Sequence, residues 1–272
     1  MVFTVFRAGI REVTSTDWLT SRHSFSFGDH YDPSNTHHGL LIACNEEVLL
    51  PGHGFDAHHH SDSEIVTWVI SGTLVHTDSA GHAGVVYPGL AQRMSAGSGI
   101  EHTERNDPWP DRADSGSTPV HYVQMWIVPD EYGVTPSYEQ RDISAALDRG
   151  GLVAVASGDP AVDAAITITN RAATLFAVRM APDSSVSLPD ARFTHVHVVD
   201  GTAVLTTRDE DDSVRAPGIQ LAAGDAARGV DSTGSTLHSQ SGAEILVWAM
   251  DKALGEPRRG CNRQRAVTGW KS

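Results

Sequence analysis

The chain has 272 residues, of which 40% are hydrophobic and 20% are charged, and its formal net charge is −14. This composition indicates a folded globular protein, and the acidic balance argues against a broad surface for binding nucleic acid. The two cysteines provide no disulfide framework and indicate a reducing compartment.

The first residues, MVFTVFRAGIREV, place Arg7 and Arg11 too early for the apolar segment of a secretory signal. The longest uninterrupted apolar run is Ile245 to Met250, which is too short to span a bilayer. The sequence therefore predicts a soluble, cytoplasmic protein with no membrane partner.

Strand-like segments dominate the chain. β-branched and aromatic residues are concentrated in Glu64–Asp78, Val120–Asp130 and Thr174–Pro182, and glycine-containing turns recur along the sequence. One short helix is predicted within Pro136–Gly151, because proline suits a helix entry and the closing Gly-Gly pair suits a stop. These patterns predict an all-β fold with one short helix rather than a parallel α/β fold.

A weak internal repeat divides the chain. The segment Glu64–Asp78 can be laid over Phe193–Asp209, which places Gly72 on Gly201, and the second copy carries a loop insertion at Asp209–Gly218. Two similar β units are therefore expected. The predicted division is residues 1–135 for a first domain, 136–165 for a helical and loop connection, and 166–272 for a second domain with a basic tail.

Three consecutive histidines follow a glycine turn in the stretch GFDAHHHSDSE. Side chains alternate along an extended segment, so His58 and His60 are predicted to face one way and His59 the other. Glu64 and Trp68 continue the parity of the first pair, provided that the chain between His60 and Glu64 remains regular.

A second pair of donors, His102 and Glu104, lies two residues apart in SAGSGIEHTERN. Two strands that each supply two donors could form a cage of three imidazoles and one carboxylate. This donor set suits a first-row divalent ion and leaves coordination positions for substrate or oxygen. A lone HxH pair is more often solvated or packed, so the metal-site prediction depends on the combination.

The second repeat also contains an HxH pair, His195 and His197, in FTHVHVVDG. This pair lies closer to its turn glycine than the first pair does, and the matching positions are Ser187 and Pro189. We therefore expect metal only in the first domain, with His195 and His197 as ordinary strand residues.

The order of these motifs resembles a cupin, and the stretch from Gly54 to Asn106 resembles the metal-binding core of the pirin family. The likeness extends to RHSFSFGDHYDP and PSYEQ, spans about residues 1 to 250 and thins in the second half. It implies two cupin domains, each a jelly-roll-like double-stranded β-helix. The family pattern is met at Gly54, Phe55, His58, His60, Glu64, His76, Asp78, Gly81, Gly84, Pro88, Gly89, Gln92, Met94, Ala96, Gly97, Gly99, Ile100, His102 and Glu104.

Carried across position by position, the resemblance implies a set of four metal ligands: His58, His60, His102 and Glu104. Many cupins bind metal through a glutamate at the position of Glu64, whereas pirins use the one at the position of Glu104. Whether His59 or Glu64 joins the metal shell stays open from the sequence, because the family commonly has an apolar residue or proline in place of His59.

The likeness to bacterial pirins implies a quercetin 2,3-dioxygenase, which opens the heterocycle of a flavonol with O2. Fe(II) is the expected metal, with Ni, Mn, Cu, Co or Zn as alternatives. Glu104 would act as general base on the flavonol 3-hydroxyl, and apolar residues such as Trp68 and Met94 would hold the rings.

The alternative function is a pirin-type regulator. Such a protein binds metal and modulates a protein partner, either a metabolic enzyme or a transcription factor, without turnover. Neither function requires direct contact with nucleic acid. The sequence favours the enzyme over the regulator. A storage or purely structural cupin is the least expected function, because the ligand set is complete and leaves open coordination positions.

Overall fold

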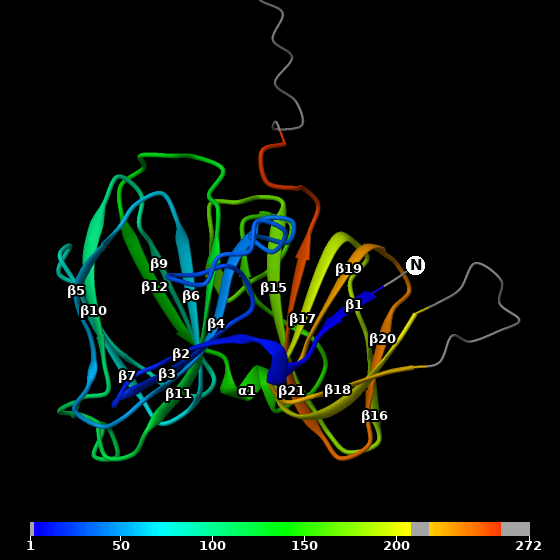
Figure 1. The fold of residues 1–272 in the computed structure, drawn as a ribbon, viewed down its shortest axis with the longest axis horizontal. Helices are drawn as coiled ribbons and strands as arrows, with labels where there is room; N and C mark the ends of the chain where they lie inside the picture. Colours follow the sequence, from blue (N-terminus) through cyan, green and yellow to red (C-terminus); the bar gives the residue numbers. More distant parts are fainter. Residues whose placement is uncertain (1–2, 208–217, 257–272) are drawn as a thin grey trace, which may run out of the picture.

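A computed structural model describes residues 3–207 and 218–256, and within them the protein is all-β apart from two short helical segments (Figure 1). Most of the predicted insertion and most of the predicted basic tail, residues 208–217 and 257–272, lie outside the described residues. None of the described helices is long and apolar enough to cross a membrane. The cytoplasmic location stays a prediction.

The first β unit consists of a seven-stranded and a four-stranded sheet. The larger sheet has the order β12 (Ser137–Asp142), β9 (Leu90–Ser95), β6 (Glu64–Ser71), β11 (Val120–Ile127), β4 (Leu41–Leu49), β3 (Leu19–His23) and β2 (Glu12–Ser15). The smaller sheet has the order β5 (Gly54–His60), β10 (Ile100–Arg105), β7 (Leu74–Asp78) and β8 (Ala83–Val86).

The second β unit is one ten-stranded sheet system, which lies beside the first unit (Figure 1). Its main order is β1 (Phe3–Phe6), β19 (Ala226–Ser232), β17 (Ala191–Thr206), β21 (Ala243–Met250), β15 (Ala173–Met180), β13 (Val153–Ser157) and β14 (Ile166–Thr167). The strands outside this path are β16 (Ser184–Ser187), β18 (Ile219–Ala222) and β20 (Thr236–Ser239).

The N-terminal strand β1 pairs with β19 of the second unit, and the 3₁₀ segment η1 (Ala8–Ile10) then leads the chain back to the first unit. Strand β12, which follows the first unit in the sequence, pairs with β9 and forms an edge of the seven-stranded sheet. The domain boundaries at residues 135 and 165 stay predictions, since no feature of the fold places them there.

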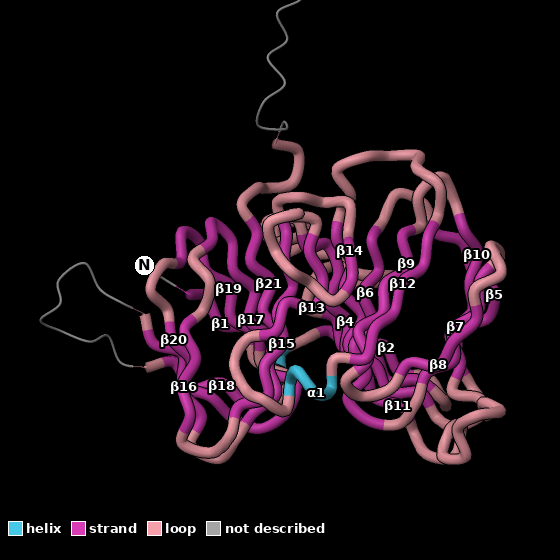
Figure 2. The backbone as a smooth tube through the Cα atoms, turned by 180° about the vertical axis from the view of Figure 1, so that it is seen from behind, coloured by secondary structure: helices cyan, strands magenta, loops and turns pink. Residues whose placement is uncertain are grey.

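The prediction of one short helix within Pro136–Gly151 is confirmed, but its expected start at Pro136 is wrong. Residues Ser137–Asp142 form strand β12, in which Tyr138 pairs with Met94 of β9. Only α1 (Ser144–Leu147) is helical, and it lies at the base of the molecule between the two units (Figure 2). The edge of β9 offers backbone partners along a whole strand, and this tertiary pairing outweighs the weak local helix signals.

A shared hydrophobic core joins the two units. Trp68 and Trp248 are both buried in it, at 0% and 1% exposed. The Trp68 Nε1–H donates to Glu244 Oε1 at 2.7 Å, and the Trp248 Nε1–H lies 3.2 Å from Met125 Sδ. Each indole therefore buries its ring and satisfies its single donor on the opposite unit.

Candidate metal centre

Two antiparallel strands, β5 and β10, bring the predicted histidines together. His102 lies opposite His58 in the pairing register, while Ile100 lies opposite His60. The His102 ring lies 4.4 Å from that of His58 and 4.9 Å from that of His60. His59 is exposed and lies outside the cluster. Within the HxH pair, the alternation predicted from the sequence is thus confirmed.

The imidazole nitrogens in this cluster suit a metal ion. One ring nitrogen from each of His58, His60 and His102 lies within 4.8 Å of the others. The Nε2 atoms of His60 and His102 are buried and have no hydrogen-bond partner in the described part of the chain. His58 Nδ1–H donates to the Asp56 carbonyl at 2.7 Å, which leaves the Nε2 lone pair of His58 free.

The His60 and His102 rings are in the neutral form, which a metal ion requires of an imidazole ligand. Burial and the neighbouring histidines lower the pKa of His60 to about 4 and that of His102 to about 3. Both imidazoles are therefore neutral at pH 7 and present a lone pair. Buried, unpartnered lone pairs that converge are unfavourable by themselves, and a divalent cation would satisfy them together.

Glu104 follows His102 in β10 after a β-bulge against β5, and it is 3% exposed. Both carboxylate oxygens accept hydrogen bonds of 2.8 Å from Gln124 Nε2, and Gln124 Oε1 accepts one from Trp126 Nε1. Glu104 shares a 4.8 Å group with His102 and His76, not with His58 and His60. Its role as the fourth ligand stays a prediction.

His76 is a site residue that the ligand prediction missed. It is 1% exposed; its Nδ1 lies 3.4 Å from His102 Nδ1 and its Nε2 lies 3.3 Å from Asp78 Oδ2. A proton on His76 Nε2 and one on His102 Nδ1 satisfy both contacts and leave the His102 Nε2 lone pair free. The signal in the sequence was the HxD pair in strand β7, LVHTD.

Glu64 lies outside both histidine groups and is 1% exposed. Its carboxylate accepts hydrogen bonds from Ser95 Oγ at 2.6 Å and from Thr169 Oγ1 at 2.7 Å. The second bond connects it to the linking segment before β15. Glu64 thus joins parts of the fold, and both of its carboxylate oxygens already accept hydrogen bonds from these hydroxyl groups.

The parity expected to continue from His60 to Trp68 is wrong. Asp62 adopts a left-handed φ of 48°, and the chain leaves the four-stranded sheet for the seven-stranded one at this point. The bend resets the alternation, so Trp68 packs into the core between the units and does not line the histidine site. Met94 packs in a cluster with Ile65, and Trp126 and Tyr138 pack against this cluster.

Aromatic rings form the walls around the histidines. The Trp126 ring lies edge-on to His60 at 4.8 Å, Tyr138 stacks on His76 at 4.8 Å, and Phe55 lies 6.0 Å from His58. Such flat apolar faces exclude water and match a planar ligand. These residues lie beside the histidines, where the sequence had predicted Trp68.

The second HxH pair lies in strand β17 of the other unit. His195 and His197 are each 1% exposed, and neither belongs to a metal-binding group among the described residues. Burial lowers the pKa of both histidines, aided by the Arg228 guanidinium at His195 and by the Arg11 guanidinium at His197, and the pKa of His197 falls to about 3. These positive charges disfavour a divalent ion at this place.

Comparison with known proteins finds one matching family model and several proteins of similar sequence. Residues 7–127 match the family model described as Pirin. A Mycobacterium tuberculosis protein named "Putative quercetin 2,3-dioxygenase" is 51% identical over 250 residues, which cover 92% of this chain and 96% of that protein. The Escherichia coli protein named "Quercetin 2,3-dioxygenase" is 42% identical over 139 residues, 51% of this chain and 57% of its own length.

A solved structure shows the same overall fold. The bacterial pirin YhhW from Escherichia coli, in complex with nickel(II), superimposes with a TM-score of 0.79 at 30% identity, covering 93% of this chain and all of that one. A quercetin 2,3-dioxygenase from Acinetobacter baumannii has a TM-score of 0.67 at 20% identity, a likeness that concerns the fold alone.

Proposed function

The chain belongs to the pirin family, and we propose that it is a metal-dependent dioxygenase that opens the heterocycle of a flavonol such as quercetin with O2. The observation that carries this proposal is the convergence of buried, unpartnered imidazole nitrogens beside a buried carboxylate. The quercetin 2,3-dioxygenase names of relatives at 42–51% identity support the choice of substrate class.

Four side chains would hold the metal: the Nε2 atoms of His58, His60 and His102, and the carboxylate of Glu104. We propose Fe(II), with Ni, Mn, Cu, Co or Zn as alternatives, since ligands of this type do not select strongly among these ions. When bound, the ion would supply Lewis-acid activation of the flavonol oxygens and, if it is redox-active, a route for electrons to O2.

Glu104 has a further role in moving a proton. Its carboxylate would accept the proton of the flavonol 3-hydroxyl, because the ionised flavonolate is the electron-rich form that reacts with O2. Gln124 donates to both oxygens of Glu104 and is itself held by Trp126, so the carboxylate is fixed in orientation before substrate enters. The ring then opens to a depside with loss of carbon monoxide.

Aromatic side chains would bind the flavonol rings and exclude water. Trp126, Tyr138 and Phe55 present faces and edges around the histidines, and the first two pack against the cluster that contains Met94. A dry, aromatic surround strengthens the interaction between substrate anion and cation and limits side reactions of the opened ring.

The test combines metal analysis of the purified protein with aerobic loss of quercetin, followed by absorbance, and with detection of carbon monoxide. We expect turnover by the metal-loaded protein and a loss of about 10²–10⁴-fold in kcat for Glu104→Gln, with metal content less affected. Full metal occupancy without turnover of quercetin or related flavonols would overturn the dioxygenase proposal. That result would favour the alternative, a metal-binding regulator of a protein partner.

A further inference from the structure

Asp78 lies one contact beyond His76, at the end of strand β7, and its side chain is 0% exposed. Its Oδ1 accepts hydrogen bonds from the backbone N–H groups of Ala80 and His82, both at 3.0 Å. Its Oδ2 lies 3.3 Å from His76 Nε2, and the partly exposed His82 ring lies within 3.1 Å of both oxygens through Nδ1. The turn between β7 and β8 thus fixes the carboxylate through Oδ1 and leaves Oδ2 beside His76.

The contacts from Asp78 to His102 have one direction of donation. An ionised carboxylate only accepts hydrogen bonds, so His76 donates from Nε2. A divalent ion at His102 disfavours a second positive charge on His76, which leaves His76 Nδ1 as an acceptor. His102 Nδ1, 3.4 Å away, then carries the proton, and the buried His102 Nε2, unpartnered among the described residues, keeps its lone pair for the metal.

The surrounding strands hold these groups in place. Strands β7 and β10 pair in a register that sets Asp78 opposite His102 and His76 opposite Glu104. The Tyr138 ring stacks on the buried His76 ring at 4.8 Å, with 26° between the two planes. A stacked, buried imidazole keeps its two nitrogens on separate partners, so a preference at Nε2 is passed on to Nδ1.

We propose that Asp78 is a positioning residue for the metal centre: acting through His76, it assigns the proton of His102 to Nδ1 and so presents Nε2 to the metal ion. This inference rests on His102 as a metal ligand and is independent of the reaction that the metal supports. The competing role is that of a turn residue only, which Oδ1 alone would serve. The two roles predict opposite orders of effect for the same two substitutions.

Asp78→Asn should reverse the direction of donation. The two backbone N–H groups that bind Oδ1 require an acceptor, so the amide oxygen takes that place and the amide nitrogen faces His76 Nε2. His76 then accepts at Nε2 and carries its proton on Nδ1, opposite the N–H of His102. The conflict is relieved only when the His102 proton lies on Nε2, where it blocks the metal. Asp78→Ala removes the preference without imposing the opposite one.

The test is the affinity of the purified, full-length protein for Zn(II), measured by competition with a chelator. We expect Asp78→Asn to weaken Zn(II) binding about 100-fold and Asp78→Ala about tenfold, the range typical of groups that orient a metal-binding imidazole. Urea midpoints should show the opposite order, because the asparagine oxygen preserves the hydrogen bonds of the turn and alanine does not. If alanine weakens Zn(II) binding as much as asparagine or more, Asp78 serves only the turn and the proposal is wrong.

A double substitution separates action through His76 from a direct effect of Asp78. In a protein that already carries His76→Gln, Asp78→Asn should change the Zn(II) affinity by less than about twofold, because the intermediate imidazole is gone. A larger further loss would show that Asp78 acts without His76 and would contradict the proposal.

Nitrogen-15 NMR of the histidine-labelled, Zn(II)-loaded wild-type protein gives a test that does not depend on the folding of any variant. We expect protons on Nε2 of His76 and on Nδ1 of His102. A proton on Nδ1 of His76, or no binding of Zn(II) by the wild-type protein, would overturn the proposal. If these results hold but no flavonol is consumed, the dioxygenase proposal fails and this one stands.

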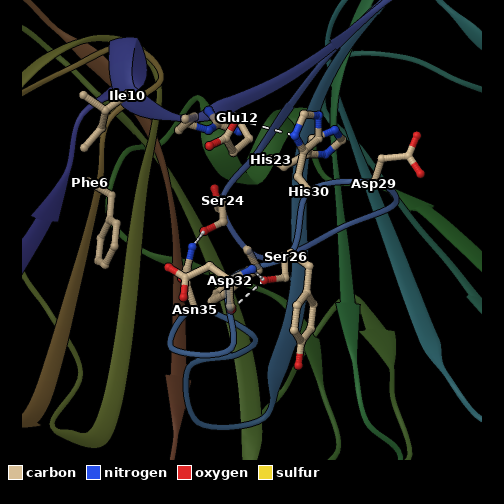
Figure 3. A pocket seen from close by; sticks show the side chains of 13 residues that line it. Phe6, Ile10, Glu12, His23, Ser24, Ser26, Asp29, His30, Asp32 and Asn35 are labelled. Carbon is tan, nitrogen blue, oxygen red and sulfur yellow. Dashed lines mark hydrogen bonds and ion pairs between the residues drawn. The ribbon is translucent and has the colours of Figure 1, made fainter.

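An exposed carboxylate–histidine contact provides the matched control. Glu12 Oε2 lies 3.5 Å from His30 Nδ1 at a cavity of about 390 Å³, which is lined by Phe6 and by side chains of residues 24–35 (Figure 3). The Glu12 side chain is 70% exposed, and none of the predicted metal ligands lines this cavity. Glu12→Gln makes the same change from acid to amide beside a histidine and should leave the Zn(II) affinity within about twofold of wild type. A loss equal to that of Asp78→Asn would assign the effect to net charge and refute the role of His76.

Discussion

The two β units of this protein each carry an HxH pair on a strand, yet the pairs have different surroundings. In the first unit, His58 and His60 face His102 from the neighbouring strand, and lone pairs converge. In the second unit, His195 and His197 are packed in strand β17 near Arg228 and Arg11. The motif is the same, but among the described residues only the first pair belongs to a group of converging metal donors, and the second pair lies beside guanidinium groups.

This difference shows that the partner strand determines what an HxH pair can do. Strand β10 supplies His102 opposite β5, and β7 supplies His76 behind it. Opposite β17, the neighbouring strands place Arg228 and Trp248 beside His195. A cation-binding cage therefore requires a register in which neighbouring strands place further donors opposite the HxH pair. The HxH motif alone does not show which residues lie opposite it.

The largest expected effect is on metal binding, and it compares His60 of the first HxH pair with the adjacent His59. His60→Ala should abolish metal binding, because it removes a buried nitrogen that has no other partner. His59→Ala, one residue earlier and exposed, is the matched control and should retain the metal. Metal content of the two purified proteins decides the matter. Equal loss in both variants would contradict the proposed direction of the side chains.

Substitution of His76, whose Nδ1 contacts Nδ1 of His102, should have the next largest effect on metal binding. His76→Gln should weaken metal affinity by about 10–100-fold, as is typical when the group that orients a ligating imidazole is removed. His238→Gln is the control in the second unit, where His238 Nδ1 lies 3.1 Å from Oγ of the exposed Ser185. Competition with a chelator measures the affinity. Complete loss of metal in His76→Gln would instead support His76 as a ligand, as its group with His102 and Glu104 allows.

The junction between the units gives a third prediction. Trp68→Phe should reduce the free energy of unfolding by about 1–3 kcal/mol, because Glu244 loses a buried hydrogen-bond donor. Trp18→Phe changes a half-buried indole in the first unit and should have a smaller effect. Urea denaturation of both variants measures the difference. Equal destabilisation would mean that the bond across the units contributes little.

The smallest effect concerns acid sensitivity in the second unit. The folded pKa of His197 is about 3, below the ordinary value of 6.5, so the unfolded chain binds more protons between these pH values. Stability should therefore fall as the pH drops below about 6.5, by up to about 1.4 kcal/mol per pH unit from this group. His197→Leu should flatten the decline without changing its onset.

Urea unfolding of the wild-type protein and of His197→Leu between pH 7 and pH 5 measures this contribution. Exposed His37 provides the control, because His37→Leu should leave the slope unchanged. An identical slope in all three proteins would show that His197 is not buried in its neutral form.

Several features followed from the sequence because they depend on local periodicity and residue type. Alternation within one strand predicted that His58 and His60 share a face, and strand composition predicted the all-β fold. The donor types indicated a divalent metal site, and the order of motifs placed it in the first half of the chain. These inferences do not require knowledge of which strands are neighbours.

Other features required the tertiary structure. The left-handed Asp62 moves the chain from one sheet to another, so parity counted from His60 does not reach Trp68. Pairing of β12 with β9 converts the start of the expected helix into a strand, and the β10–β7 pairing brings His76 to His102. Local sequence preferences amount to tenths of a kcal/mol per residue, whereas sheet register and burial fix whole strands at once, and these long-range contacts decided where each side chain lies.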